Sequence, residues 1–152
     1  MRIRRLIGML GVALASSACN LDVPDDGVSL ALYVAVDKGT IELGDSVTVT
    51  VTARNVGFEP FSLTAPSDCL LYIDVYDAQD SQIFNSASNC MGASVTQEIA
   101  AGADFERTFV WHGNGTAGAR VPSGLYRIRP VAQLTGRPGY PGPSATVAVE
   151  GG

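Results

Sequence analysis

Residues 46–55 read SVTVTVTARN, an almost unbroken alternation of apolar and polar side chains. Val47, Val49, Val51 and Ala53 occupy every second position, with threonines between them. Successive side chains of a β-strand point to opposite faces of a sheet. This period of two therefore predicts a strand with one buried face and one solvated face.

The same alternation recurs along the chain, and helical spacing is not sustained anywhere after residue 18. Turn residues, glycine in most of the turns, separate the alternating runs. This pattern predicts an all-β fold, an immunoglobulin-like antiparallel β-sandwich of about eight strands, with a closed barrel as the structural alternative. The approximate spans, one of them expected to be irregular, are 29–37, 46–55, 58–64, 69–76, 81–85, 94–99, 104–112, 124–133 and 143–150.

The first 18 residues have the three parts of a secretory signal. Three arginines lie among the first five residues, an apolar run follows at 6–15, and the segment ends in Ser16-Ser17-Ala18. The apolar run is shorter than the roughly 20 residues that a membrane-spanning helix needs. We therefore expect residues 1–18 to be a signal peptide and the mature chain to begin near Cys19.

The junction Ser16-Ser17-Ala18-Cys19 resembles the lipobox of bacterial lipoproteins, in which a cysteine is linked to diacylglycerol and becomes the N-terminus. The resemblance implies lipidation of Cys19, with acyl chains such as palmitate. It also implies a location in the cell envelope, anchored to a membrane by lipid at the outer membrane or on the periplasmic side. Ordinary signal peptidase also accepts small residues at this junction, so plain secretion is the alternative.

The cysteine count favours lipidation. The chain has three cysteines, Cys19, Cys69 and Cys90, and an odd number in an exported protein leaves one unpaired. Lipidation of Cys19 leaves Cys69 and Cys90 to form a disulfide in an oxidising compartment. A structural role is favoured over a redox role, because a catalytic pair usually has the Cys-x-x-Cys spacing.

Charge and length limit the function classes. Three of the ten basic residues precede residue 18, which leaves seven against 15 acidic residues and a formal charge near −8. A nucleic-acid-binding protein needs clustered Lys and Arg, and the seven here are scattered, so nucleic acid is excluded as a partner. We expect a flexible segment at 19–27, which is polar and acidic, and one domain at 28–150.

Several motifs occur in one order. A strand ends in Asn55, the segment 72–77 (YIDVYD) precedes a turn, Ile99-Ala-Ala-Gly102 precedes a strand that ends in Trp111, and Gly124-Leu-Tyr126 follows. This order resembles the BsuPI family of intracellular proteinase inhibitors over residues 28–150. The resemblance implies an immunoglobulin-like fold and a protein partner, with a protease as the specific case. The chain departs from the family pattern in its export signal and its cysteine pair.

Catalytic and metal chemistry are not indicated. His112 is the single histidine and ends a predicted strand, and no Gly-x-Ser-x-Gly motif is present, so we expect no enzyme activity. Asp74, Asp77 and Asp80 surround a turn and offer oxygen ligands for calcium. Aspartate is a common turn former and the calcium-loop pattern is absent, so we expect no metal and no cofactor.

Aromatic residues allow two interpretations. Phe105, Phe109 and Trp111 share one strand face, and Tyr126 follows Gly124 closely. They predict core packing, because a small sandwich needs its few large aromatic side chains inside. A ligand-stacking platform, as in carbohydrate binding, is the alternative.

Two exposed loops are candidates for protease contact. The Gly-rich loop 112–122 presents the bond Arg120–Val121, and the loop 136–144 presents Arg137. The bond Arg120–Val121 resembles a trypsin substrate more closely than Arg137–Pro138 does, because a bond that precedes proline is a poor substrate. We therefore predict a non-enzymatic interaction domain of an envelope lipoprotein, with a carbohydrate- or ligand-binding module or a purely structural envelope domain as alternatives.

Overall fold

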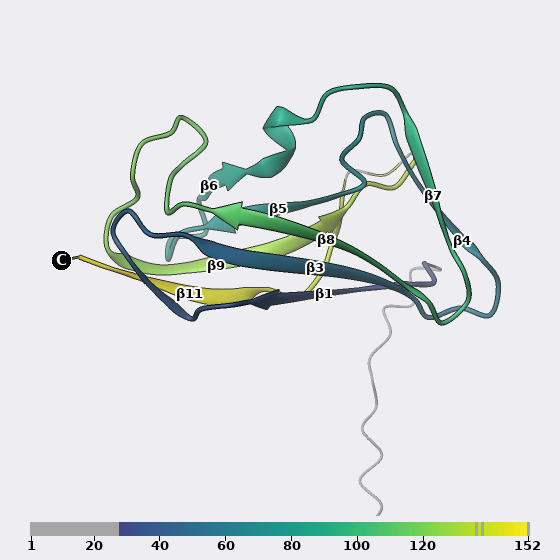
Figure 1. Cartoon of the computed structure of the whole chain (residues 1–152), viewed down its shortest axis with the longest axis horizontal. Coiled ribbons are helices and arrows are strands. Elements are labelled where there is room, and N and C mark those ends of the chain that lie inside the picture. Colours follow the sequence, from purple (N-terminus) through teal and green to yellow (C-terminus); the bar gives the residue numbers. More distant parts are fainter. Residues whose placement is uncertain (1–27, 136, 138, 152) are drawn as a thin grey trace, which may run out of the picture.

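The computed structural model describes residues 28–135, 137 and 139–151 (Figure 1). The predicted signal peptide 1–18, the lipidation site Cys19 and the predicted flexible segment 19–27 lie outside the described residues. The described chain forms β1 (Leu30–Val36), β2 (Thr40–Glu42), β3 (Val47–Asn55), β4 (Phe61–Ala65), β5 (Leu71–Tyr76), β6 (Gln82–Asn85), the 3-10 turn η1 (Ser86–Asn89), β7 (Val95–Ile99), β8 (Asp104–Trp111), β9 (Gly124–Ala132), β10 (Tyr140–Pro141) and β11 (Ala145–Glu150).

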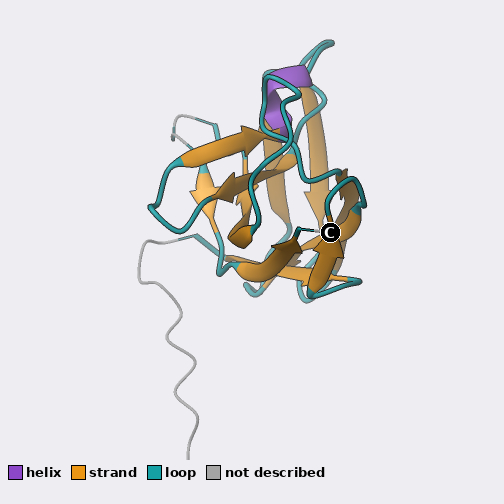
Figure 2. Cartoon of the chain, turned by 90° about the vertical axis from the view of Figure 1, so that its left-hand side faces the viewer, coloured by secondary structure: helices purple, strands orange, loops and turns teal. Residues whose placement is uncertain are grey.

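Two sheets form the two layers of a β-sandwich (Figure 2). One sheet has the order β1-β3-β8, and the other has the order β2-β11-β9-β5-β6, with β10 paired to β9. Every strand pair in them is antiparallel except β2 with β11. The predicted immunoglobulin-like antiparallel β-sandwich is confirmed.

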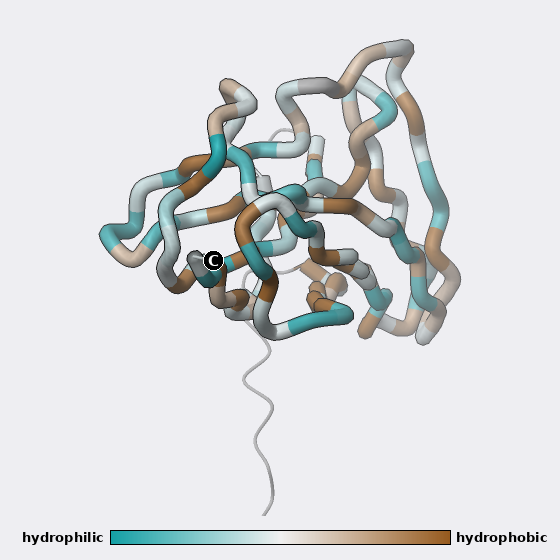
Figure 3. The backbone as a smooth tube through the Cα atoms, turned by 60° about the vertical axis from the view of Figure 1, so that its left-hand side comes forward, coloured by the Kyte–Doolittle hydropathy of each residue, from teal (hydrophilic) through white to brown (hydrophobic). Residues whose placement is uncertain are grey.

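The core lies between the layers and is built by alternation. In β3, Val47, Val49, Val51 and Ala53 are fully buried, and the residues between them face outward. The opposite layer contributes buried apolar residues such as Ile73 from β5. Figure 3 shows hydrophobic and hydrophilic residues alternating along the strands. Each buried aliphatic side chain of this kind contributes about 1.5–3 kcal/mol relative to an exposed one.

All nine predicted spans contain a strand, but the sheet pattern is richer than predicted. The strands β4 and β7 pair only with each other and form a separate two-stranded sheet at one end of the sandwich (Figure 1). The short strands β2 and β10 were not predicted, because three and two residues are too few to establish a period of two. The described chain therefore has eleven strands rather than about eight.

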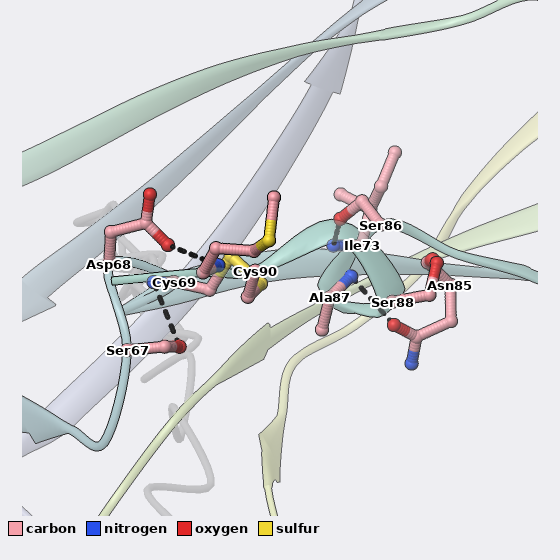
Figure 4. Close-up of a disulfide and its surroundings, with 10 residues drawn as sticks. Ser67, Asp68, Cys69, Ile73, Asn85, Ser86, Ala87, Ser88 and Cys90 are labelled. Carbon is pink, nitrogen blue, oxygen red and sulfur yellow. Dashed lines mark hydrogen bonds between the residues drawn. A yellow bond between two sulfur atoms is a disulfide. The ribbon is translucent and has the colours of Figure 1, made fainter. Parts of the chain in front are cut away.

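Cys69 and Cys90 form the predicted disulfide, with their Cα atoms 5.6 Å apart (Figure 4). The bond joins the segment before β5 to the residue that follows η1. Hydrogen bonds reinforce the junction, from Met91 N to Asp68 Oδ1 at 3.2 Å and from Ile73 N to Ser86 Oγ at 2.9 Å. The disulfide therefore holds β6 and η1 against the start of β5.

Asn55, at the end of β3, connects three segments from a fully buried position. Its Nδ2 donates to Glu59 O at 2.7 Å and to Ile99 O at 2.9 Å, and its Oδ1 accepts from Gly57 N at 2.9 Å. Its backbone carbonyl also accepts from Gly102 N. The strand-ending Asn and the Ala-Gly turn of the sequence motif are thus parts of one hydrogen-bonded corner.

Candidate functional site

Two neighbouring strands place a group of polar and aromatic side chains on the outer surface of the larger sheet. In β5 and β9, Tyr76 lies opposite Arg127 and Asp74 lies opposite Arg129. Alternation turns these residues and Tyr72 away from the core, because Ile73, Val75 and Ile128 between them are buried. We call this surface the tyrosine–arginine face; its residues are Tyr72, Asp74, Tyr76, Arg127 and Arg129.

Asp74 is the buried centre of this face, with only 6% of the residue exposed. One carboxylate oxygen accepts from Gln82 Nε2 at 2.6 Å and from Asn85 Nδ2 at 2.8 Å. The other accepts from the Tyr76 hydroxyl at 3.4 Å and lies 3.6 Å from Arg129. A buried carboxylate is costly unless it is paired and hydrogen-bonded, so these contacts explain how Asp74 is accommodated.

Arg129 is fixed by its neighbours on β5. Its guanidinium carbon lies 4.4 Å from the centroid of the Tyr76 ring, and an Nη atom donates to the Tyr76 hydroxyl. A guanidinium over an aromatic ring is stabilised by cation–π attraction, more strongly where water is partly excluded. Asp74, which lies opposite Arg129 on β5, also attracts the guanidinium group electrostatically. Arg129 is therefore held in one orientation by residues of β5.

Both tyrosines of the face remain neutral at physiological pH. Burial raises the pKa of the Tyr72 hydroxyl above its ordinary value, and the negative charge of Asp74 adds to the rise. The pKa of Tyr76 is raised by the same two causes in the same order, with Arg129 opposing. The face can therefore offer phenol hydroxyls and guanidinium groups to a partner, but no phenolate nucleophile.

The rim of the face is exposed and charged. Arg127 pairs with Asp80 of the β5–β6 turn, and both side chains are exposed, Arg127 less than Asp80. Leu125, which precedes Arg127 on the same side of β9, is 61% exposed. Aromatic and arginine side chains are among the residue types that are enriched at protein–protein interfaces.

The three aspartates considered for calcium have separate roles. Asp74 belongs to the tyrosine–arginine face, and Asp80 pairs with Arg127. Asp77 Oδ1 accepts from Gln79 N and Ser81 N, both at 2.9 Å, which is the geometry of an Asx-type turn. Among the described residues, the one cluster of metal-ligand type is Asp68 with Cys69 and Cys90, and the disulfide occupies both of its sulfur atoms.

The bond Arg120–Val121, predicted as a protease-contact site, is not exposed in the way that a protease substrate must be. Arg120 is exposed, but Val121 is only 6% exposed and its N donates to Gly113 O. Arg120 itself forms a β-bridge with Asn114. Val121 was therefore wrongly placed in an accessible loop: the loop folds back on itself because apolar Val121 is buried in the core.

Arg137 lies in another part of the molecule. It is exposed and lines a cavity of about 470 Å³ with residues of β4 and of the chain after β9, including Thr64 and Leu134. Arg120 instead lies near Gly44 of the β2–β3 turn. The two arginines therefore do not form one contact surface.

The aromatic residues of β8 and β9 confirm the core interpretation for Trp111, which is 1% exposed. Its ring centroid lies 5.5 Å from that of Tyr126, and its Nε1 donates to Asn114 O at 2.9 Å. The Tyr126 hydroxyl donates to Pro122 O at 2.6 Å, which is a tyrosine corner of the immunoglobulin fold. Phe105 and Phe109 are half-buried. Trp111 therefore does not form a ligand platform.

The tyrosine–arginine face was not predicted from the sequence, although the sequence contains a signal for it. The segment Tyr72-Ile-Asp-Val-Tyr76 alternates with its polar side chains on one face, and Arg127 and Arg129 do the same on β9. That these two faces meet depends on the pairing of β5 with β9, which no local pattern shows.

No known protein-family model matches the chain, and no curated protein matches it. Solved structures do resemble it. A β-glucosidase from Erythrobacter marinus superposes with a TM-score of 0.52 at 13% identity, over 80% of this chain and 15% of that one. The alkylpurine DNA glycosylase AlkC of Pseudomonas fluorescens gives 0.53 at 12%, over 80% and 30%.

The sporulation control protein Spo0M of Bacillus subtilis gives a TM-score of 0.50 at 11% identity, over 81% of this chain and 50% of that one. The chain thus spans half or less of each of these three proteins. The likeness shows the fold alone. Within the described residues, the chain forms no helix with the length and hydropathy of a membrane span.

Proposed function

We propose that this protein is a non-enzymatic envelope lipoprotein whose domain docks on a protein partner through the tyrosine–arginine face. The observation that carries the proposal is the orientation of Arg129, which is stacked on Tyr76 and paired with buried Asp74. A side chain that is ordered before binding loses little entropy when a partner contacts it. Arg and Tyr are also the residues that most often dominate docking energies.

The same geometry favours a protein partner over a carbohydrate. A sugar ring stacks on a free aromatic face, but the Arg129 guanidinium already covers one side of the Tyr76 ring. A planar guanidinium, with its fixed fork of donors, instead suits carboxylates and backbone carbonyls of a polypeptide. A carbohydrate- or ligand-binding module and a purely structural envelope domain remain the alternatives.

The lipid anchor is supported by the disulfide. Cys69 and Cys90 pair with each other, so Cys19 is the cysteine left over from an odd count. An exposed free thiol is a liability in an oxidising compartment, and lipidation removes it.

Replacing Cys19 by Ala is expected to release the protein from the membrane fraction into the soluble fraction of the envelope. The thioether to diacylglycerol requires the cysteine sulfur, and stable anchoring depends on the acyl chains. The measurement is fractionation of cells followed by mass analysis of the N-terminus. The Cys69→Ala/Cys90→Ala variant, which keeps Cys19, serves as the control and should stay with the membrane. Membrane association that survives Cys19→Ala contradicts the anchor.

Docking is tested with a photo-crosslinking amino acid at position 127 in living cells. Arg127 lies on the proposed face, and Thr108, on the outward side of β8, is the matched exposed control on the opposite sheet. We expect one discrete protein adduct from position 127 and none from position 108. Equal adducts at both positions, or none at either, would oppose the proposed face.

Competition makes the experiment specific. Excess soluble Cys19→Ala protein should suppress the adduct, whereas the same protein with Arg129→Lys should compete poorly. Lysine keeps the charge but cannot stack as a planar fork on Tyr76. Equal competition by both proteins would show that the stacked guanidinium is not the recognised group.

Protease inhibition, which the resemblance to the BsuPI family implies, stays a more specific prediction within this proposal. The adduct from position 127 would identify the partner as a protease or as another protein. The buried position of Val121 removes the bond Arg120–Val121 as its reactive site.

A further inference from the structure

Phe58 is the most exposed large apolar side chain among the described residues, at 98%. It lies at the tip of the loop between β3 and β4, residues 56–60. The residues on both sides of it are held by one side chain: Gly57 N donates to Asn55 Oδ1 at 2.9 Å, and Asn55 Nδ2 donates to Glu59 O at 2.7 Å. Pro60 further restricts the loop. Phe58 is therefore presented outward by a fixed loop.

This loop is joined to the segment by which the chain enters the domain. Val56 N donates to Ser29 O at 3.0 Å, directly before β1 begins at Leu30. A Cβ atom on Gly57 would lie 2.7 Å from Ser29 Cβ, so glycine is required for this close approach. Val56, beside Phe58, is itself 42% exposed. In Figure 1 the start of β1 and the β3–β4 connection lie at the same end, opposite the C-terminus.

We propose that the loop 56–60 is a membrane-contacting tip, which places Phe58, with Val56 beside it, in the interfacial region of the bilayer that holds Cys19. This inference rests on the proposed lipid anchor. A chain of nine residues, the length of 19–27, reaches about 30 Å when extended and about 15–18 Å as a flexible coil. The end of the domain that carries Phe58 is therefore the end held next to the lipid.

The anchor makes one aromatic side chain sufficient for contact. A lone phenylalanine binds a bilayer interface too weakly to recruit a free protein. Once a diacylglycerol group is inserted, the second contact is intramolecular, at an effective concentration of roughly millimolar order for a short linker. Because the mature chain is strongly acidic, the contact depends on apolar insertion and not on attraction to anionic lipids. This orientation leaves the tyrosine–arginine face on the side of the domain, open to a partner.

The test uses the purified lipidated protein in zwitterionic vesicles, half of them prepared with lipids brominated in the acyl chains. Phe58→Trp puts a fluorophore at the tip, and Val110→Trp is the matched control, 49% exposed near the end of β8 that lies away from the loop. Buried Trp111 contributes the same background to both variants. Bromine quenches tryptophan only at short range, so the difference between the vesicles reports insertion into the interface.

We expect the added emission of Phe58→Trp to be lower in brominated than in unbrominated vesicles, and that of Val110→Trp to be the same in both. Quenching at position 58 should disappear in the variant that combines Phe58→Trp with Cys19→Ala. If the protein floats with the vesicles but position 58 is not quenched, the membrane-contacting tip is overturned and the anchor stands. Equal quenching at positions 58 and 110 has the same meaning. Protein that carries no lipid and does not float overturns both proposals together.

Discussion

Replacing Asn55 by Ala is expected to lower the free energy of unfolding by about 3–5 kcal/mol. The substitution removes three hydrogen bonds at once and leaves Gly57 N, Glu59 O and Ile99 O without this partner. Each buried polar group left unsatisfied costs about 1–3 kcal/mol, and part of the corner is open enough for water to replace the lost contact. Urea denaturation in the Cys19→Ala background measures the change.

Two further variants control this experiment. Asn55→Asp keeps the size of the side chain and the acceptor for Gly57 N, but it places a carboxylate against the two carbonyl oxygens that Asn55 Nδ2 contacts. It should be at least as destabilising as alanine. Asn114→Ala removes an amide from a half-buried loop position and should change stability by about 0.5 kcal/mol or less. A loss below about 1 kcal/mol in Asn55→Ala would contradict the structural role of the corner.

Removal of the disulfide by Cys69→Ala/Cys90→Ala is expected to cost about 3 kcal/mol. The bond closes a loop between residues 21 apart in the sequence, and in the chain-entropy model its loss lets the unfolded chain explore more conformations. The measurement is again urea denaturation, on the mature chain with Cys19→Ala. Cm should fall, and the slope of the transition should rise, because the unfolded chain without the cross-link exposes more surface.

A reducing agent provides the matched test of the same bond. It should lower the stability of the protein that contains Cys69 and Cys90 to that of the double variant, and it should leave the double variant unchanged. Mass analysis of the unreduced protein should find the two cysteine peptides joined. Free thiols at both positions, or equal stability with and without reductant, would refute the assignment.

The motifs that suggested a family are largely structural. Asn55 forms a loop corner, Trp111 is a core residue, and Tyr126 forms the tyrosine corner with Pro122. Such residues serve any immunoglobulin-like sandwich, whatever it binds. The resemblance to the BsuPI inhibitors therefore remains a prediction about activity, while the fold that it implied is confirmed.

Local patterns in the sequence determined most of the secondary structure and the disulfide. The period of two placed the strands and assigned the buried face of β3, because alternation of side chains is a property of a single extended segment. Cysteine counting paired Cys69 with Cys90 for a reason that needs no coordinates. Trp111 was assigned to the core because a small sandwich has few large side chains to fill it.

Only the tertiary structure decided which surfaces these segments form together. The contact of Arg129 with Tyr76 joins residues 53 positions apart, and it depends on β5 lying beside β9 in one register. The burial of Val121 depends on a loop folding back onto the core. The position of Phe58 depends on the hydrogen bonds of the Asn55 side chain within its loop and on the bond from Val56 N to Ser29 O. Strand order and register are selected by packing of the whole core, so a local period can say which way a side chain points but not what it will meet.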